Sequence, residues 1–191
     1  MSRGINATTK AALQTDGFKL ATLIQIDFPA RGVNPAFSKK ITNFGSDLTA
    51  TMGTFTSSGH ILGIGNASET SSLRVNSLNL ILSGADREYI TLFQEEHYMN
   101  ARCVIWRAVI DNSNAIVGDP FLYFDGRITG YSLNDDESSS EIDVEIASHW
   151  KDFEKVINRK TNTNSQQVHF PTDLGFEFSS STVKDLKWGR K

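Results

Sequence analysis

The chain has 191 residues, with 19 basic and 22 acidic side chains and a formal net charge of -3 at pH 7. This length suits one domain, or one domain with an appended segment, and it can bury a core without disulfides. The charge balance excludes general nucleic-acid recognition, which needs a concentrated basic surface. The single cysteine, Cys103, excludes an internal disulfide and a multi-cysteine metal site. No stretch reaches the ~20 apolar residues of a membrane span, and the start lacks a signal peptide, so we expect a soluble protein made in a cytoplasm.

The amino-terminal part predicts a short helix followed by paired strands. The helix covers residues 6–15, with Asn6 or Thr8 as its cap and Gly17 as its stop. A strand follows at residues 19–28, where alternate positions form one mostly apolar face: Leu20, Thr22, Ile24, Ile26 and Phe28. After a turn with Pro29, Gly32 and Pro35, residues 37–42 are its predicted partner strand.

The next segment predicts short strands and a second helix. Residues 44–65 are rich in glycine, serine and threonine, which favours short strands or a long exposed loop. Residues 73–82 predict a strand whose apolar parity changes near Asn76 and Ser77, and a β-bulge there would realign it. Asp86 is then the predicted cap of a helix of about ten residues that buries Ile90 and Phe93.

The second half predicts further antiparallel strands. Residues 102–110 form a strand that ends in a polar turn at 111–114, and residues 121–133 form a strand or bent pair broken by Gly126 and Gly130. The clearest strand is 141–147, with Ile142, Val144 and Ile146 facing the core and Glu141, Asp143 and Glu145 facing outward. A hairpin loop at 135–140 precedes it, a short helix at 150–156 follows, and a polar run at 158–167 comes next.

We find no pattern of residues that predicts catalysis or metal binding, so we expect no enzyme and no cofactor. The histidines at positions 60, 97, 149 and 169 are far apart in sequence, and Cys103 lies in an apolar strand without a nearby base. The acidic residues 135–137 lack the glycine and the final glutamate of a calcium loop, which favours a solvated hairpin tip.

Motifs along nearly the whole chain carry a resemblance to a known family. They are Ser68-Glu69-Thr70-Ser71, Leu73-Arg74-Val75-Asn76, Leu80-Ile81-Leu82-Ser83-Gly84-Ala85-Asp86, Asp119-Pro120, Phe124-Asp125-Gly126-Arg127, Arg159-Lys160, Gln166-Gln167, Phe170-Pro171, Gly175-Phe176-Glu177-Phe178 and Lys187-Trp188-Gly189-Arg190. In the order and spacing of these motifs, the chain resembles the hub proteins at the tail tip of long-tailed bacteriophages and gene transfer agents.

This resemblance implies a mostly β fold: an antiparallel β-barrel or sandwich hub domain at residues 1–158, with two or three short helices, and an extended carboxy-terminal arm at 159–191. It implies a structural virion protein, made in the bacterial host cytoplasm, that forms a hub ring at the tail tip. That ring would link the tail tube and distal tail ring to the central spike or fibre. Its partners would be itself, with a homotrimer favoured and a hexameric ring possible, and other tail proteins.

The predicted interface residues are Phe176, Phe178 and Trp188 in the arm and Arg74 and Arg127 at strand ends. A polar stretch separates the arm's aromatic cluster from the hub domain, and so short a cluster cannot form a core alone. A neighbouring subunit, another tail protein or the protomer's own core must therefore cover these rings. For the two arginines, an intrachain and an intersubunit ion pair both stay open. Longer members of the family carry a cysteine-bearing segment associated in some with an iron–sulfur cluster, which a chain with Cys103 alone cannot hold.

Two other functions are compatible with the sequence. A carbohydrate-binding tail module would need an exposed aromatic platform, for which Trp106 or Tyr123 could serve, and burial of both rings would exclude it. A tail-associated peptidase or hydrolase would need a nucleophile and a base in contact, which the sequence does not indicate.

Overall fold

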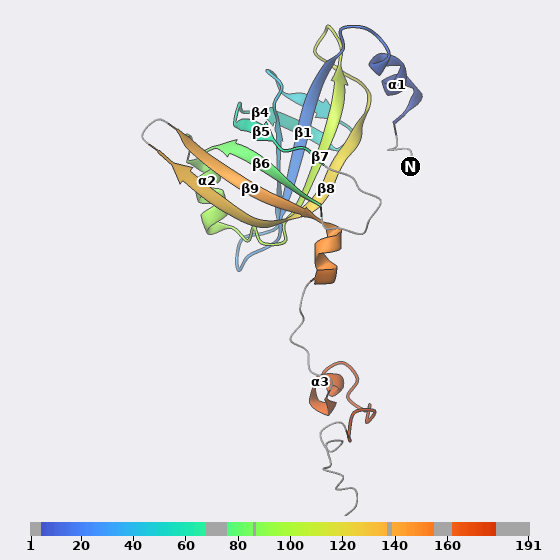
Figure 1. Cartoon of the computed structure of the whole chain (residues 1–191), viewed down its shortest axis with the longest axis vertical. Coiled ribbons are helices and arrows are strands. Elements are labelled where there is room, and N and C mark those ends of the chain that lie inside the picture. The colour runs from blue at the N-terminus through green and yellow to red at the C-terminus, as the bar shows by residue number, and fades with distance from the viewer. Residues whose placement is uncertain (1–4, 68–75, 86, 137–138, 155–161, 179–191) are drawn as a thin grey trace, which may run out of the picture. The chain divides into compact units, whose positions relative to one another are not determined.

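The computed structural model describes residues 5–67, 76–85, 87–136, 139–154 and 162–178. The chain divides into two compact units, Met1–Phe153 and Glu154–Lys191. The first unit is a mostly β structure built on one large sheet, and the second contains a short helix (Figure 1). The predicted mostly β fold is therefore confirmed.

The amino-terminal elements follow the predicted order. Helix α1 spans Ala7–Leu13, and Asn6 is its cap because the Asn6 side chain accepts a hydrogen bond of 2.7 Å from the Thr9 amide. Strand β1 spans Lys19–Phe28 and pairs antiparallel with β2, Phe37–Thr42, which has the predicted bounds. Between them, Arg31 and Asn34 close a turn through two backbone hydrogen bonds.

Short strands fill the glycine- and serine-rich segment. They are β3, Leu48–Ala50, β4, Gly53–Ser57, and β5, Ile61–Ile64, followed by β6, Ser77–Ser83. The strand predicted to start at residue 73 is described from Ser77 onward. Its first residues and the predicted bulge beside them lie at or beyond the edge of the described range.

Helix α2 spans Glu88–Glu95 and is shorter than predicted. Its amino-terminal cap is Arg87, with φ at 26° and no capping side-chain bond. Asp86 itself lies outside the described residues. The helix buries Tyr89 and Phe93, since positions four apart share one face.

Three long strands complete the first unit. They are β7, Arg102–Ile110, β8, Ile116–Asp135, and β9, Ser140–Ser148, followed by the 3-10 helix η1, His149–Glu154. Strand β8 runs through Gly126 and Gly130, so neither ends it as predicted, but its pairing with β9 shifts register between Ile128 and Gly130. At Gly126 a β-carbon would lie 2.5 Å from the carbonyl oxygen of Ala147, so glycine lets β8 and β9 approach closely.

The strand order is β3-β4-β2-β1-β7-β8-β9-β6-β5, and the pairs are antiparallel except β2 with β4. The first part of β8 pairs with β7 and its second part with β9, so β8 joins the two halves of the sheet. The order has two ends, which makes the fold an open, sandwich-like sheet and not a closed barrel (Figure 1).

The main core lies between the two halves of the folded sheet and under α2. It includes Ile24, Ile26 and Phe28 of β1 and Leu80 of β6. Ile142, Val144 and Ile146 of β9 belong to it, which confirms the predicted inward face of that strand. A second cluster lies on the other face of β1, formed by Ala21, Leu23, Leu48, Phe55, Ala108 and Ile110. The centre of β1 is therefore buried on both faces.

The second unit contains helix α3, Thr163–Gln167, inside the predicted polar run. The Asn162 side chain caps it by accepting a hydrogen bond of 2.8 Å from the Ser165 amide. Asp173 accepts hydrogen bonds from the Gly175 amide and the Gln166 side chain, each 2.8 Å long, and so ties the following turn to the helix. These polar bonds, rather than a packed core, fix the local structure, since α3 has no buried residue.

Candidate protein interface

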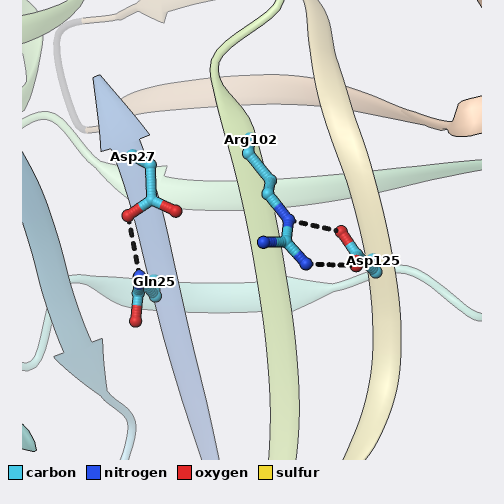
Figure 2. A network of polar contacts seen from close by, with 4 residues as sticks. All are labelled: Gln25, Asp27, Arg102 and Asp125. Carbon is cyan, nitrogen blue, oxygen red and sulfur yellow. Dashed lines mark hydrogen bonds and ion pairs between the residues drawn. The ribbon is translucent and has the colours of Figure 1, made fainter. Parts of the chain in front are cut away.

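A polar strip crosses β2, β1, β7 and β8 on the face of the sheet that carries the second cluster. Figure 2 shows its centre, where the Arg102 guanidinium donates two hydrogen bonds to Asp125, of 3.1 and 2.7 Å. On the adjacent strands Asp27 accepts hydrogen bonds from Gln25, at 2.7 Å, and from Ser38, at 2.6 Å. Of the side chains in this strip, Ser38 and Arg102 are exposed, and Gln25, Asp27 and Asp125 are half-buried.

The strip holds fixed charges and not a reactive group. The hydrogen bond and the charge of Asp125 raise the pKa of Arg102 above its usual value. The side chains of this pair are 57% and 38% exposed, so solvent screens the pair and its contribution to stability is about 0–1 kcal/mol. Such an arrangement can hydrogen-bond another protein surface and offers no nucleophile or general base.

The structure describes one of the two predicted interface arginines. Arg127 lies in β8 with an exposed side chain that donates a hydrogen bond of 3.3 Å to the carbonyl oxygen of Asn100. Its cross-strand neighbour is Arg102, which brings two guanidinium groups to the same end of the sheet. Arg74 lies outside the described residues.

The predicted aromatic anchors belong to the second unit. Phe176 is half-buried and Phe178 is 74% exposed, while Trp188 lies outside the described residues. Three further apolar side chains of this unit, not predicted as anchors, are 59–78% exposed: Val168, Phe170 and Leu174. The unit thus presents a cluster of apolar side chains without a core of its own among its described residues.

The two rings considered for carbohydrate binding do not form one platform. Trp106 is half-buried and packs against the second cluster, with Phe55 at 6.1 Å in an edge contact. Tyr123 is half-buried and packs against the main core, and the Arg107 guanidinium lies 4.4 Å from its ring centre. A sugar would need an open ring face, and this cation occupies one face of Tyr123.

The residues considered for chemistry also lie apart. Burial raises the pKa of the Cys103 thiol far above its ordinary value, so the sulfur stays protonated. His60 packs edge-on to Tyr89, and His149 packs against Trp150. Across the described ranges, no group of three or more histidine, cysteine or acidic residues is placed to hold a metal ion. None of the helices in those ranges is long and apolar enough to cross a membrane.

Comparisons with known proteins agree with the resemblance found in the sequence. No protein-family model matches this chain. Among curated proteins, the chain is similar to the baseplate hub protein pb3 of Escherichia phage T5, at 26% identity over 165 residues. The match covers 80% of this chain but 17% of that protein, so the chain spans a minor part of its length.

A solved structure shares the fold. The chain superposes on one from the virion of a native gene transfer agent particle with a TM-score of 0.59 and 14% sequence identity. The superposition covers 82% of this chain and 49% of the other. The first comparison confirms the resemblance to tail hub proteins of phages, and the second shows that a chain of a gene transfer agent virion has a similar fold.

Proposed function

We propose that the chain is a structural virion protein that forms an oligomeric hub ring at the tip of a phage tail. The observation that carries this proposal is the alignment with a baseplate hub protein over 80% of the chain. The fold shared with a gene transfer agent virion chain supports it. In this proposal the ring links the tail tube and distal tail ring to the central spike or fibre.

Side-by-side packing in a ring is heterologous, so each protomer offers two different surfaces to its neighbours. The partly exposed polar strip of Figure 2 is suited to such contacts, because its charges are already fixed by intrachain bonds. We favour a homotrimer over a hexameric ring. The protein acts by assembly and not by catalysis, and it needs no cofactor.

The hub domain covers residues 1–158, and residues 159–191 act as an arm that contacts a neighbouring subunit or another tail protein. Phe176, Phe178 and Trp188 are its anchors, with Arg74 and Arg127 as charged contacts on the hub. The exposed apolar side chains of the second unit support this, since about 25 cal/mol is gained for each Å² of apolar surface that a partner covers.

Electron microscopy of intact particles carrying a tagged copy of the chain tests the proposal. A gold label on the tag should appear at the end of the tail, below the tube. A label on the capsid, along the tail tube or absent from mature particles would contradict the proposed position. Hydrolysis of peptidoglycan or peptides by the purified chain, abolished by one substitution, would contradict the structural role.

A further inference from the structure

We propose that a surface centred on Arg107 of one copy binds the acidic end of the β8–β9 hairpin, at Asp135, of a second copy. This inference rests on the proposed ring, because it names a contact between its protomers. It uses the described residues of the first unit alone and is independent of the arm.

Arg107 lies on the core-facing side of the sheet, beyond the end of the main core. Its cross-strand neighbours are Thr22 on β1 and Phe121 on β8, and directly opposite residues share one face of a sheet. On that face the next pair along is Leu20 with Val109. Phe121 is half-buried and Leu20 is 39% exposed, so Arg107 lies within a partly open apolar surface.

Arg107 has no anionic partner among the described residues. Its Nε is buried without a hydrogen-bond acceptor, and its guanidinium stacks on the Tyr123 ring at 4.4 Å. Other arginines of the unit do have acceptors, such as Arg102 at Asp125 and Arg127 at the Asn100 carbonyl. The described residues therefore leave the charge of Arg107 unmatched, and a carboxylate of a second copy that reaches its terminal amino groups would form a charge-assisted hydrogen bond with it.

The end of the β8–β9 hairpin has the complementary chemistry. Leu133 and Asp135 are two residues apart on β8 and therefore point to the same side of the strand. Leu133 is 38% exposed, Asp135 is exposed, and the Asp135 carboxylate has no salt bridge within the described ranges. Leu133 and Asp135 are about 6.6 Å apart along the strand. Arg107 and Leu20, as diagonal neighbours, are roughly 7–8 Å apart. Asp135 can therefore meet Arg107 while Leu133 meets Leu20.

One protomer cannot make this contact with itself. Phe121 and Asp135 lie near opposite ends of the 20-residue strand β8, and the chain between them extends about 46 Å at a rise of 3.3 Å per residue. Figure 1 shows the hairpin at the left of the unit and the start of β8 at the upper right. A contact between different surfaces of two copies is heterologous, which is the geometry that closes a ring.

Charge reversal in the full chain tests this contact. Arg107→Glu removes the cationic surface, and Asp135→Lys removes the acidic one. The matched controls are Lys10→Glu and Asp16→Lys, which make the same charge changes at exposed positions of α1 and its following loop. Association is measured by sedimentation velocity over a range of concentrations, and circular dichroism checks the fold of each variant.

We expect the wild type and both controls to associate, and each charge reversal to weaken association at least about tenfold, the equivalent of 1.4 kcal/mol. An equimolar mixture of Arg107→Glu and Asp135→Lys should associate again, because each variant keeps one intact surface for the other. If Arg107→Glu misfolds, Asp135→Lys alone decides, since it changes an exposed hairpin position.

Other outcomes overturn the contact. If Asp135→Lys associates as the wild type does, Arg107 and Asp135 do not meet. The same follows if the mixture of the two variants stays dissociated. In both cases the proposed ring still stands. A wild type that remains monomeric at its highest soluble concentration overturns both the contact and the self-assembled ring. The position of the chain in the tail is still decided separately by electron microscopy.

Discussion

Val144 and Asp143 are adjacent residues of β9 that face opposite environments. The Val144 side chain is fully buried in the main core, between residues of β6 and β8 that pair with β9. Asp143 is half-buried on the outer face, where its carboxylate accepts a hydrogen bond of 3.2 Å from Asn79. The alternation of environments follows from the period of two along a strand, which is why sequence alone predicted it.

We therefore predict very different costs for two substitutions in this strand. Val144→Asp places an unpaired carboxylate in the core and should lower the free energy of unfolding by several kcal/mol. Asp143→Ser should change it by no more than about 0.5 kcal/mol, because a short polar side chain replaces an outward one. Urea unfolding followed by circular dichroism measures both. Equal midpoints would show that the two faces are assigned wrongly.

Cys103 gives a prediction about reactivity and pH. Because burial raises the pKa of its thiol in the folded state, the thiol should not react with a disulfide reagent at pH 8 until denaturant is added. The folded chain also holds this proton when the unfolded chain loses it. Stability should therefore fall as the pH rises above 9.0, the ordinary pKa of the thiol. Rapid labelling of the native protein would contradict the burial of Cys103.

At the scale of elements, helix α1 is fixed to β8 through a glycine. Gly118 has φ at +70°, and a β-carbon there would lie 2.4 Å from the Thr9 hydroxyl and 2.9 Å from the Asn6 side-chain oxygen. The Thr9 hydroxyl also donates to the carbonyl oxygens of Val117 and Asp119. The cap of α1 and the start of β8 therefore fit together only when position 118 has no side chain.

Gly118→Ala should accordingly destabilise the first unit more than Gly59→Ala does. Gly59 also has a positive φ, at +66°, but a β-carbon there meets nothing within 4 Å. The control should show only the backbone strain, about 1–2 kcal/mol, and Gly118→Ala should add the cost of displacing α1. Thermal unfolding of both variants measures the difference. Similar melting temperatures would mean that α1 is not held by this contact.

The elements that sequence predicted best are those bounded by turn residues. Strands β2 and β7 have the predicted bounds, because a turn with Pro35 precedes β2 and a polar turn follows Ile110 at the end of β7. Strand β8 is longer than the predicted range 121–133, because it begins at Ile116, before Pro120, and ends at Asp135. Glycine in a strand marks either a break or a close approach of two strands, and only the tertiary structure separates the two.

The interface residues named from the sequence stay predictions. The resemblance to tail hub proteins directed attention to Arg127 and the aromatic residues of the arm. Arg107 was not named from the sequence, although a cation in the middle of the otherwise apolar run from Cys103 to Ile110 was a visible signal. Its stacking partner, Tyr123, sits where the register of β7 and β8 shifts between Ile105 and Trp106. No periodicity in the sequence predicts which residue such a shift brings under the guanidinium.

At the scale of the whole molecule, the two units differ in how they are stabilised. The first has two apolar clusters and a sheet of nine strands. The second, in its described residues, has a five-residue helix without a buried residue and several exposed apolar side chains. In the proposed assembly a partner surface would stabilise this unit, because segments ordered on assembly bury apolar area that they cannot bury alone.

Truncation after Asn158 tests this division of roles. The shortened chain keeps every strand and both apolar clusters, so its melting temperature should stay within a few degrees of that of the full chain. It should fail to enter particles, because it lacks Phe176, Phe178 and Trp188 as anchors. Complementation of a deletion phage, followed by blotting of purified particles, measures incorporation. If the truncated chain unfolds by itself, the arm belongs to the protomer's own core, and if it enters particles normally, the arm makes no contact that assembly needs.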